Sequence, residues 1–144
     1  MNRFAYFDKT HLPIINIKFN NTINNIKEYQ QFERDWLCCY MEKDKFVFLF
    51  DTTNVGYVNP LYAYELSKFI YKLKYELKSN LLKYSIIKVS NWYIKHLLNI
   101  TFLIQSPVAP VYIVEENINM IDLYNDIEDN KTIKDDNILF INNE

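Results

Sequence analysis

Five polar residues at one point in the chain form the first candidate site. The apolar segment Phe46–Asp51 ends in a carboxylate, and Thr52, Thr53, Asn54 and Asn59 follow it with hydroxyl and amide groups. Ligands of open α/β sheets bind beyond the carboxyl ends of strands, so this loop is where we expect a partner or substrate to bind. The same side chains also serve to satisfy the amides of turns and helix starts, and this structural interpretation is the favoured one.

Side chains suited to covalent or metal chemistry are few. Cys38, Cys39 and His96 could supply three metal ligands, but they lack the C-x-x-C or H-x-x-x-H spacing of metal sites. Adjacent cysteines cannot close an unstrained disulfide, and we interpret the pair as helix residues of which at least one is buried. The single glycine, Gly56, argues against a phosphate-binding loop. We therefore expect no catalytic residue, metal or cofactor, and an enzyme centred on Asp51 is the weakest alternative.

Two segments offer surfaces for a partner. The segment 90–110 carries Trp92, Tyr93 and Leu103 among few charges, which indicates a helix covered by neighbours or presented to a partner. The preceding helical segment has an outer face that combines cations with aromatic rings, which suits an anionic lipid headgroup. A solvated face is the favoured interpretation there. The residues of this strip are Tyr64, Lys68, Tyr71, Lys72, Tyr75 and Lys78.

The hydrophobic pattern predicts the elements that position these groups. Phe46–Asp51 has five apolar residues in succession, as expected for a central strand covered on both faces. Phe4–Phe7 and Pro13–Phe19 predict a hairpin or two edge strands around a polar turn at Asp8–His11. The other predicted elements are a helix between Asn24 and Glu42, a helix from Pro60 capped by Asn59, a strand at Tyr84–Val89, a helix capped by Asn91, a strand at Val111–Glu115 and an amphipathic stretch at 118–127.

The alternation of strands and helices predicts the fold class. Parallel βαβ units should form an α/β sheet of about four or five strands, mostly parallel. The segment Ile138–Ile141 is either a further edge strand or a segment that docks on a partner, and the pattern leaves this open. We expect one domain over residues 1–144, with a polar C-terminal segment from about residue 128.

Composition narrows the function classes. The chain is 49% hydrophobic and 17% aromatic, which predicts a compact fold, and its net charge of −2 argues against a nucleic-acid partner. No secretory signal pattern or apolar run of about 20 residues is present, so we expect a cytoplasmic protein. The abundance of Asn, Ile, Lys and Tyr suggests A/T-rich codons, which would suit a large DNA virus or an A/T-rich protist.

The order of these segments resembles STAS and CRAL-TRIO domains over about residues 13–127. The resemblance is carried by FVFLFDTTNVGYVNP before a long helix, then YSIIKVSNWYIKHLL, then PVAPVYIV. It implies an α/β domain of the anti-sigma-factor-antagonist type, but Val58–Leu61 stands where the phosphorylatable Ser of such domains is expected. CRAL-TRIO domains bind a lipid, usually behind an additional helical lobe.

We therefore expect a non-catalytic protein-interaction module of STAS-like form. Its partner, a protein or a second copy of the chain, would bind at the loop after Asp51 and at the apolar segment around Trp92, Tyr93 and Leu103. The alternative is a lipid-binding or membrane-peripheral module that uses an apolar pocket or the Lys/Tyr strip.

Overall fold

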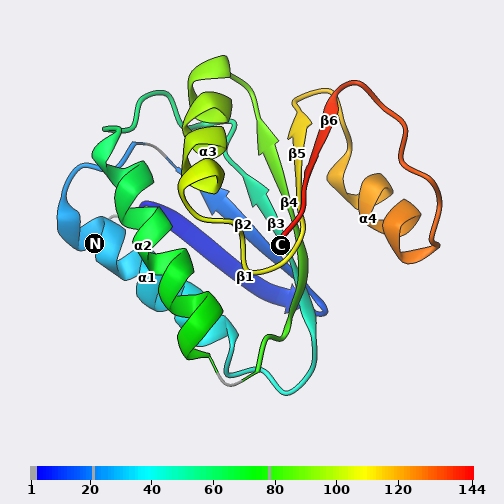
Figure 1. Cartoon of the computed structure of the whole chain (residues 1–144), viewed down its shortest axis with the longest axis horizontal. Coiled ribbons are helices and arrows are strands. Elements are labelled where there is room, and N and C mark those ends of the chain that lie inside the picture. The colour runs from blue at the N-terminus through cyan, green and yellow to red at the C-terminus, as the bar shows by residue number, and fades with distance from the viewer. Residues whose placement is uncertain (1–2, 21, 78) are drawn as a thin grey trace.

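The computed structural model describes residues 3–20, 22–77 and 79–144, and within them six strands form one sheet with four helices around it (Figure 1). The elements are β1 (Ala5–His11), β2 (Ile14–Phe19), α1 (Ile26–Cys39), β3 (Phe46–Asp51), α2 (Leu61–Glu76), β4 (Leu82–Val89), α3 (Trp92–Ile104), β5 (Val111–Glu115), α4 (Met120–Glu128) and β6 (Ile138–Ile141). The strands lie side by side in chain order. β2 to β5 are parallel, while β1 and β6 pair with them as antiparallel edges.

The α/β class and the mostly parallel sheet are confirmed, but the predicted count of four or five strands is wrong. The polar turn expected at Asp8–His11 is part of β1, and the chain reverses only at Leu12 and Pro13. The Asp8 carboxylate accepts from the Thr10 amide and hydroxyl at 2.9 and 2.7 Å, where the register with β2 shifts. This edge strand therefore carries an irregularity built from turn-type residues.

The other antiparallel edge is β6, which the sequence left open. Its four residues pair antiparallel with β5, from Val111 opposite Ile141 to Val114 opposite Ile138. A nine-residue helix, α4, and the polar segment that follows it bring the chain back along β5.

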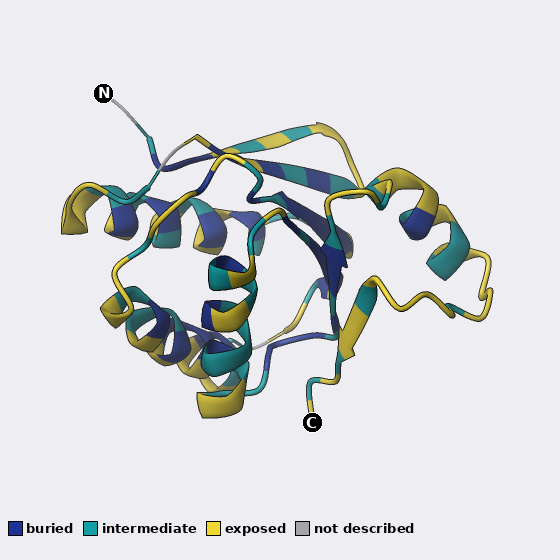
Figure 2. Ribbon diagram, turned by 90° about the horizontal axis from the view of Figure 1, so that it is seen from above, coloured by how far each residue is buried: buried dark blue, intermediate teal, exposed yellow. Residues whose placement is uncertain are grey.

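Helices cover both faces of the sheet, as the apolar run of β3 predicted. Phe46, Phe48 and Phe50 point into a core shared with α1, α2 and α3, whereas Val47 and Leu49 belong to a smaller core closed by α4. Consecutive parallel strands joined by crossovers of one hand place their connecting helices on the same face, and α1 to α3 obey this rule (Figures 1 and 2).

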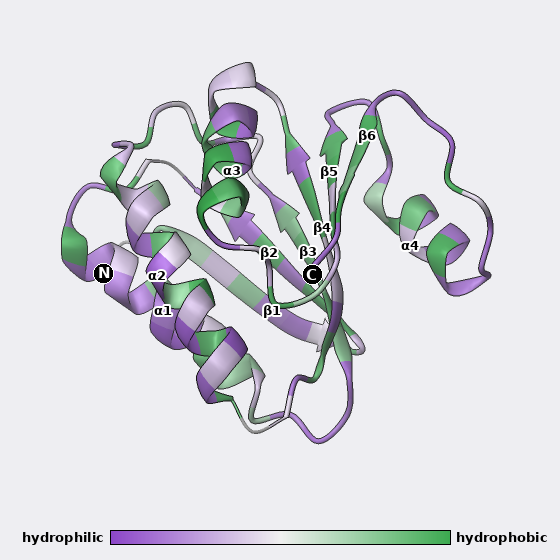
Figure 3. Ribbon diagram, viewed as in Figure 1, coloured by the Kyte–Doolittle hydropathy of each residue, from purple (hydrophilic) through white to green (hydrophobic). Residues whose placement is uncertain are grey.

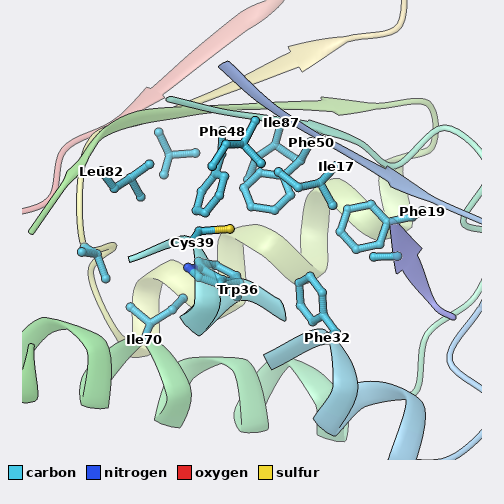
Figure 4. Packing of buried hydrophobic residues seen from close by; sticks show 14 of the residues in the cluster. Ile17, Phe19, Phe32, Trp36, Cys39, Phe48, Phe50, Ile70, Leu82 and Ile87 are labelled. Carbon is cyan, nitrogen blue, oxygen red and sulfur yellow. The ribbon is translucent and has the colours of Figure 1, made fainter. Parts of the chain in front are cut away.

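Aromatic side chains hold α1, β3 and α2 together (Figure 4). The Trp36 ring lies 5.6 Å from the rings of Phe48 and Phe50 and 5.3 Å from that of Phe69. Cys39 is fully buried beside them, and its burial raises the pKa of the thiol to about 12. The thiol therefore stays protonated at neutral pH, and the predicted buried structural cysteine is confirmed.

Asparagine side chains begin the helices. Asn25, Asn91 and Asn119 each precede a helix and accept a hydrogen bond from the backbone amide three residues later, at 2.8 to 3.0 Å. Asn59, the predicted cap of α2, accepts from the amide of Leu61 at 3.0 Å, but Pro60 occupies the N-cap position and the helix begins one residue later than predicted. These contacts give four residues of an Asn-rich composition a defined structural role.

Candidate functional site

The polar residues at the end of β3 shape the loop that follows it. The Asp51 carboxylate accepts from the Thr53 amide at 3.0 Å and from the Thr53 hydroxyl at 2.6 Å. Thr52 is buried, and its hydroxyl donates to the carbonyl of Lys88 at 2.7 Å. These contacts account for Asp51, Thr52 and Thr53 as turn residues, and the Asp51-centred enzyme loses the observation that motivated it.

Three hydrogen bonds tie this loop to the beginning of α3. The Ser90 hydroxyl donates to the Thr53 carbonyl at 3.1 Å, and the side-chain nitrogen of Asn91 donates to the Val55 carbonyl at 3.0 Å. The Tyr93 hydroxyl donates to the carbonyl of Val58 at 2.6 Å. The loop has no regular secondary structure of its own between residues 52 and 60, so these contacts fix its position.

Four rings form an aromatic cluster at this edge of the sheet: Tyr57, Trp92, Tyr93 and His96. Tyr57 stacks on Tyr93 with 5.5 Å between ring centroids, and Trp92 lies 6.2 Å from Tyr93 and 6.4 Å from His96. Trp92 is 77% exposed and Tyr57 61% exposed. The cluster is thus presented to solvent and held by the hydrogen-bonded loop beneath it.

The structure brings only part of the predicted site together. Trp92 and Tyr93 adjoin the loop from Asp51, and Asn54 and Asn59 are exposed on that loop. Leu103 is 86% exposed but lies three turns further along α3, about 16 Å away along the helix axis. Leu103 is therefore separated from Trp92 by nearly the full length of α3. Hydrophobic residues are found at the C-terminal end of α3 as well (Figure 3).

Sequence analysis missed Tyr57. It follows Gly56 in a loop of small and polar residues, and an aromatic residue in such a context is the signal that could have identified it. Its stacking on Tyr93 depends on how the loop crosses the start of α3, which is a tertiary contact.

A small cavity of about 110 Å³ lies beneath the loop. The hydroxyls of Thr52 and Thr101 line it, but they donate to the carbonyls of Lys88 and Leu97. An apolar cavity of about 150 Å³ holds a molecule the size of benzene, so this cavity is too small for a lipid chain. Its other lining residues are Phe4, Phe19, Ile23, Tyr29, Phe32, Val55, Val58, Tyr62, Ala63, Leu66, Ile94, Leu97 and Leu98.

Acidic side chains lie beside the lysines of the proposed lipid strip. Lys68 pairs with Glu65 at 3.0 Å and lies 5.1 Å from the centre of the Tyr64 ring. The groove between α1 and α2 that Lys68 and Lys72 line is also lined by three glutamates, namely Glu33, Glu65 and Glu76. Lys78 lies outside the described residues. The local charge is therefore balanced rather than cationic.

Glu33 in this groove has an altered acidity. Its partial burial raises the pKa above the ordinary 4.5, a nearby Tyr29 hydroxyl opposes this, and the Glu65 carboxylate raises the pKa further. Burial of Tyr29 raises the pKa of its hydroxyl, and the nearby Glu33 carboxylate raises it further. Among the described residues this hydroxyl has no hydrogen-bond partner.

Replacing Glu33 with glutamine is expected to stabilise the chain more at pH 7 than at about pH 4. A carboxyl whose pKa is raised on folding binds its proton more tightly in the folded state, so stability falls as pH rises from near 4.5 through the folded pKa. The uncharged amide removes this loss. Urea unfolding of both chains across this pH range measures it, and a difference that stays constant or grows toward low pH contradicts the prediction.

The three candidate metal ligands lie on two helices, α1 and α3. Cys38 is exposed and Cys39 buried at the end of α1, while His96 is exposed on α3 beside Trp92. Within residues 3–20, 22–77 and 79–144, no three His, Cys, Asp or Glu side chains gather in a way that could hold a metal ion.

Comparison of the chain with protein-family models, curated proteins and solved structures gave no match. The longest helix, α2, has 16 residues, and none of the helices in the described part of the chain combines the length and apolar character needed to cross a membrane.

Proposed function

We propose that this chain is a non-catalytic protein-interaction module whose docking site is the aromatic cluster and the loop from Asp51 to Asn59. The observation that carries the proposal is the exposure of Tyr57, on a loop fixed by hydrogen bonds, and of Trp92 beside it at the start of α3. Exposed aromatic rings that are already held in place bind a partner at little cost in conformational entropy, and such rings are enriched among the residues that dominate binding energy.

The STAS-like form remains part of this proposal. In such domains a strand ending in Asp leads through a short loop to a helix, and β3, the loop and α2 have this arrangement. The residues at the start of α2, Asn59, Pro60 and Leu61, carry no hydroxyl, so we propose a docking surface without a phosphorylation switch.

Two observations favour a protein partner over the lipid alternative. The cavity beneath the loop has about 110 Å³, enough for one small apolar group. The strip on α2 offers an anionic membrane no excess of positive charge among its described neighbours, because glutamates line the same groove.

Replacing Trp92 with aspartate is expected to abolish partner capture without unfolding the chain. Loss of a central aromatic anchor lowers affinity by about thirtyfold or more, and Trp92 contributes little to the core because it is largely exposed. The immobilised chain and the variant are each incubated with native-cell extract, and bound proteins are quantified by mass spectrometry.

Met41→Asp is the matched control, since Met41 is an exposed apolar residue beyond the end of α1. It should retain every protein that the unaltered chain captures. Equal capture by the Trp92 variant, or no specific capture by the unaltered chain, rejects the proposed site.

A further inference from the structure

The outer face of α2 carries a second exposed surface, which we name the α2 stripe: Leu61, Tyr64, Lys68, Tyr71 and Tyr75. These residues follow one another at spacings of three, four, three and four, the spacing of a coiled-coil seam. The four apolar or aromatic members are each more than half exposed. The opposite face of α2 packs into the core, so the stripe has no role in folding that explains its composition.

The α2 stripe is a ridge with a groove on each side. Tyr64 and Tyr71 line the groove toward Ile104 of α3, and Lys68 and Lys72 line both grooves. The rings of Tyr71 and Tyr75 lie 4.7 Å apart. A ridge of this kind packs against another helix whose own side chains enter the grooves.

We infer that the stripe pairs with the same stripe of a second copy of this chain, with the two α2 helices antiparallel. Lys68 is the midpoint, since Leu61 and Tyr75 each lie seven residues from it. Glu65 lies three residues before it and Lys72 four residues after it. A two-fold axis near Lys68 therefore sets Leu61 against Tyr75 of the second copy and Glu65 against Lys72 of the second copy, each contact occurring twice.

Charge selects this orientation over the parallel one. A parallel pair sets each residue near its own counterpart, so Glu65, Lys68 and Lys72 would all face like charges. In the antiparallel pair only Lys68 faces a like charge, namely Lys68 of the second copy. Glu65 and Lys72 instead form ion pairs with each other across the interface. Each Lys68 also lies near Tyr71 of the second copy, where it can repeat the cation–π contact that it makes with Tyr64.

The pairing adds a second surface to the proposed function and does not involve the aromatic cluster. Trp92→Asp should therefore lose partner capture and keep the dimer, whereas Tyr71→Asp should lose the dimer and keep partner capture. The failure of either proposal is thus distinguishable from the failure of the other.

Sedimentation equilibrium tests the pairing on the full chain. We expect the unaltered chain to dimerise at micromolar concentration, and Tyr71→Asp to raise the dimer Kd by about thirtyfold or more. Trp92→Asp should leave the Kd within about twofold, since it lies outside the stripe. Far-UV circular dichroism of each variant establishes that it is folded.

An exchange of charges tests the antiparallel register. Glu65→Lys and Lys72→Glu are each expected to weaken the dimer about tenfold, because each replaces two ion pairs with two like-charge contacts. The double variant restores both pairs and should return the Kd to within about threefold of the original. A chain that is monomeric at about 100 μM, or a double variant no tighter than the single ones, overturns the inference.

Discussion

Replacing Phe48 with alanine is expected to lower the free energy of unfolding by about 3–5 kcal/mol. Phe48 is fully buried at the centre of β3, and its ring lies 5.1 Å from those of Phe46 and Phe50 and 5.6 Å from that of Trp36. β3 is held by parallel ladders on both sides, so its backbone cannot move to fill the space left by the ring. The loss therefore includes both the transfer free energy of the removed ring and the cost of the cavity that it leaves.

Urea unfolding followed by tryptophan fluorescence measures this loss, since Trp36 contacts the altered site. Phe140→Ala is the matched control on the edge strand β6, where the side chain is half exposed. It should cost about 1 kcal/mol, because the ring keeps water on one side and packs mainly on Tyr112. Equal losses from the two substitutions would contradict the central position of Phe48 in the core.

Sequence predicted the interior of the sheet because burial leaves a simple pattern there. The run that ends at Asp51 marks β3 with its observed bounds, and Val111–Glu115 marks β5 in the same way. Both strands have helices on the two faces, which excludes polar residues from most positions. Asn91 likewise predicted the start of α3, since capping is a local interaction.

Edge strands were harder to predict, because one side of each is free of pairing. Asp8–His11 has the composition of a turn, yet it continues β1, and only its pairing with β2 shows this. Ile138–Ile141 is a short run without alternation, and its identity as β6 depends on α4 and the segment after it bringing the chain back to β5. Both strand pairings are tertiary contacts, which a local sequence pattern does not specify.

The candidate site likewise has one part that the sequence predicted and another part that it did not. Asp51 was correctly placed at the end of β3 and Asn59 in the loop that follows it, because the order of elements defines that loop. Which aromatic rings gather there could not be derived, since Tyr57 and Trp92 meet through Tyr93. The spacing of the α2 stripe was visible in the sequence, but its self-complementarity has meaning only once the structure shows that its face is exposed.

Replacing Asn91 with alanine is expected to destabilise the chain by about 2–3 kcal/mol and to release the loop that carries Tyr57. The Asn91 side chain makes two hydrogen bonds with different structural effects. Its oxygen accepts from the Ile94 amide at 2.8 Å and begins α3, and its nitrogen donates to the Val55 carbonyl at 3.0 Å and holds the loop. Loss of the cap costs about 1 kcal/mol, and an unpaired carbonyl at the buried Val55 costs about 1–2 kcal/mol more.

Asn119→Ala separates the effect of losing a helix cap from the effect of losing the contact with the loop. Asn119 caps α4 through the Asp122 amide in the same way but has no hydrogen bond to the loop. It should cost only about 1 kcal/mol and leave the loop unchanged. Hydrogen exchange measures the difference at the Val55 amide, which donates to the Thr52 carbonyl at 3.0 Å inside the loop. Exchange there should accelerate in the Asn91 variant alone. If it does not, the loop is held by Ser90 and Tyr93 without Asn91, and the rigidity of the docking site has a different origin.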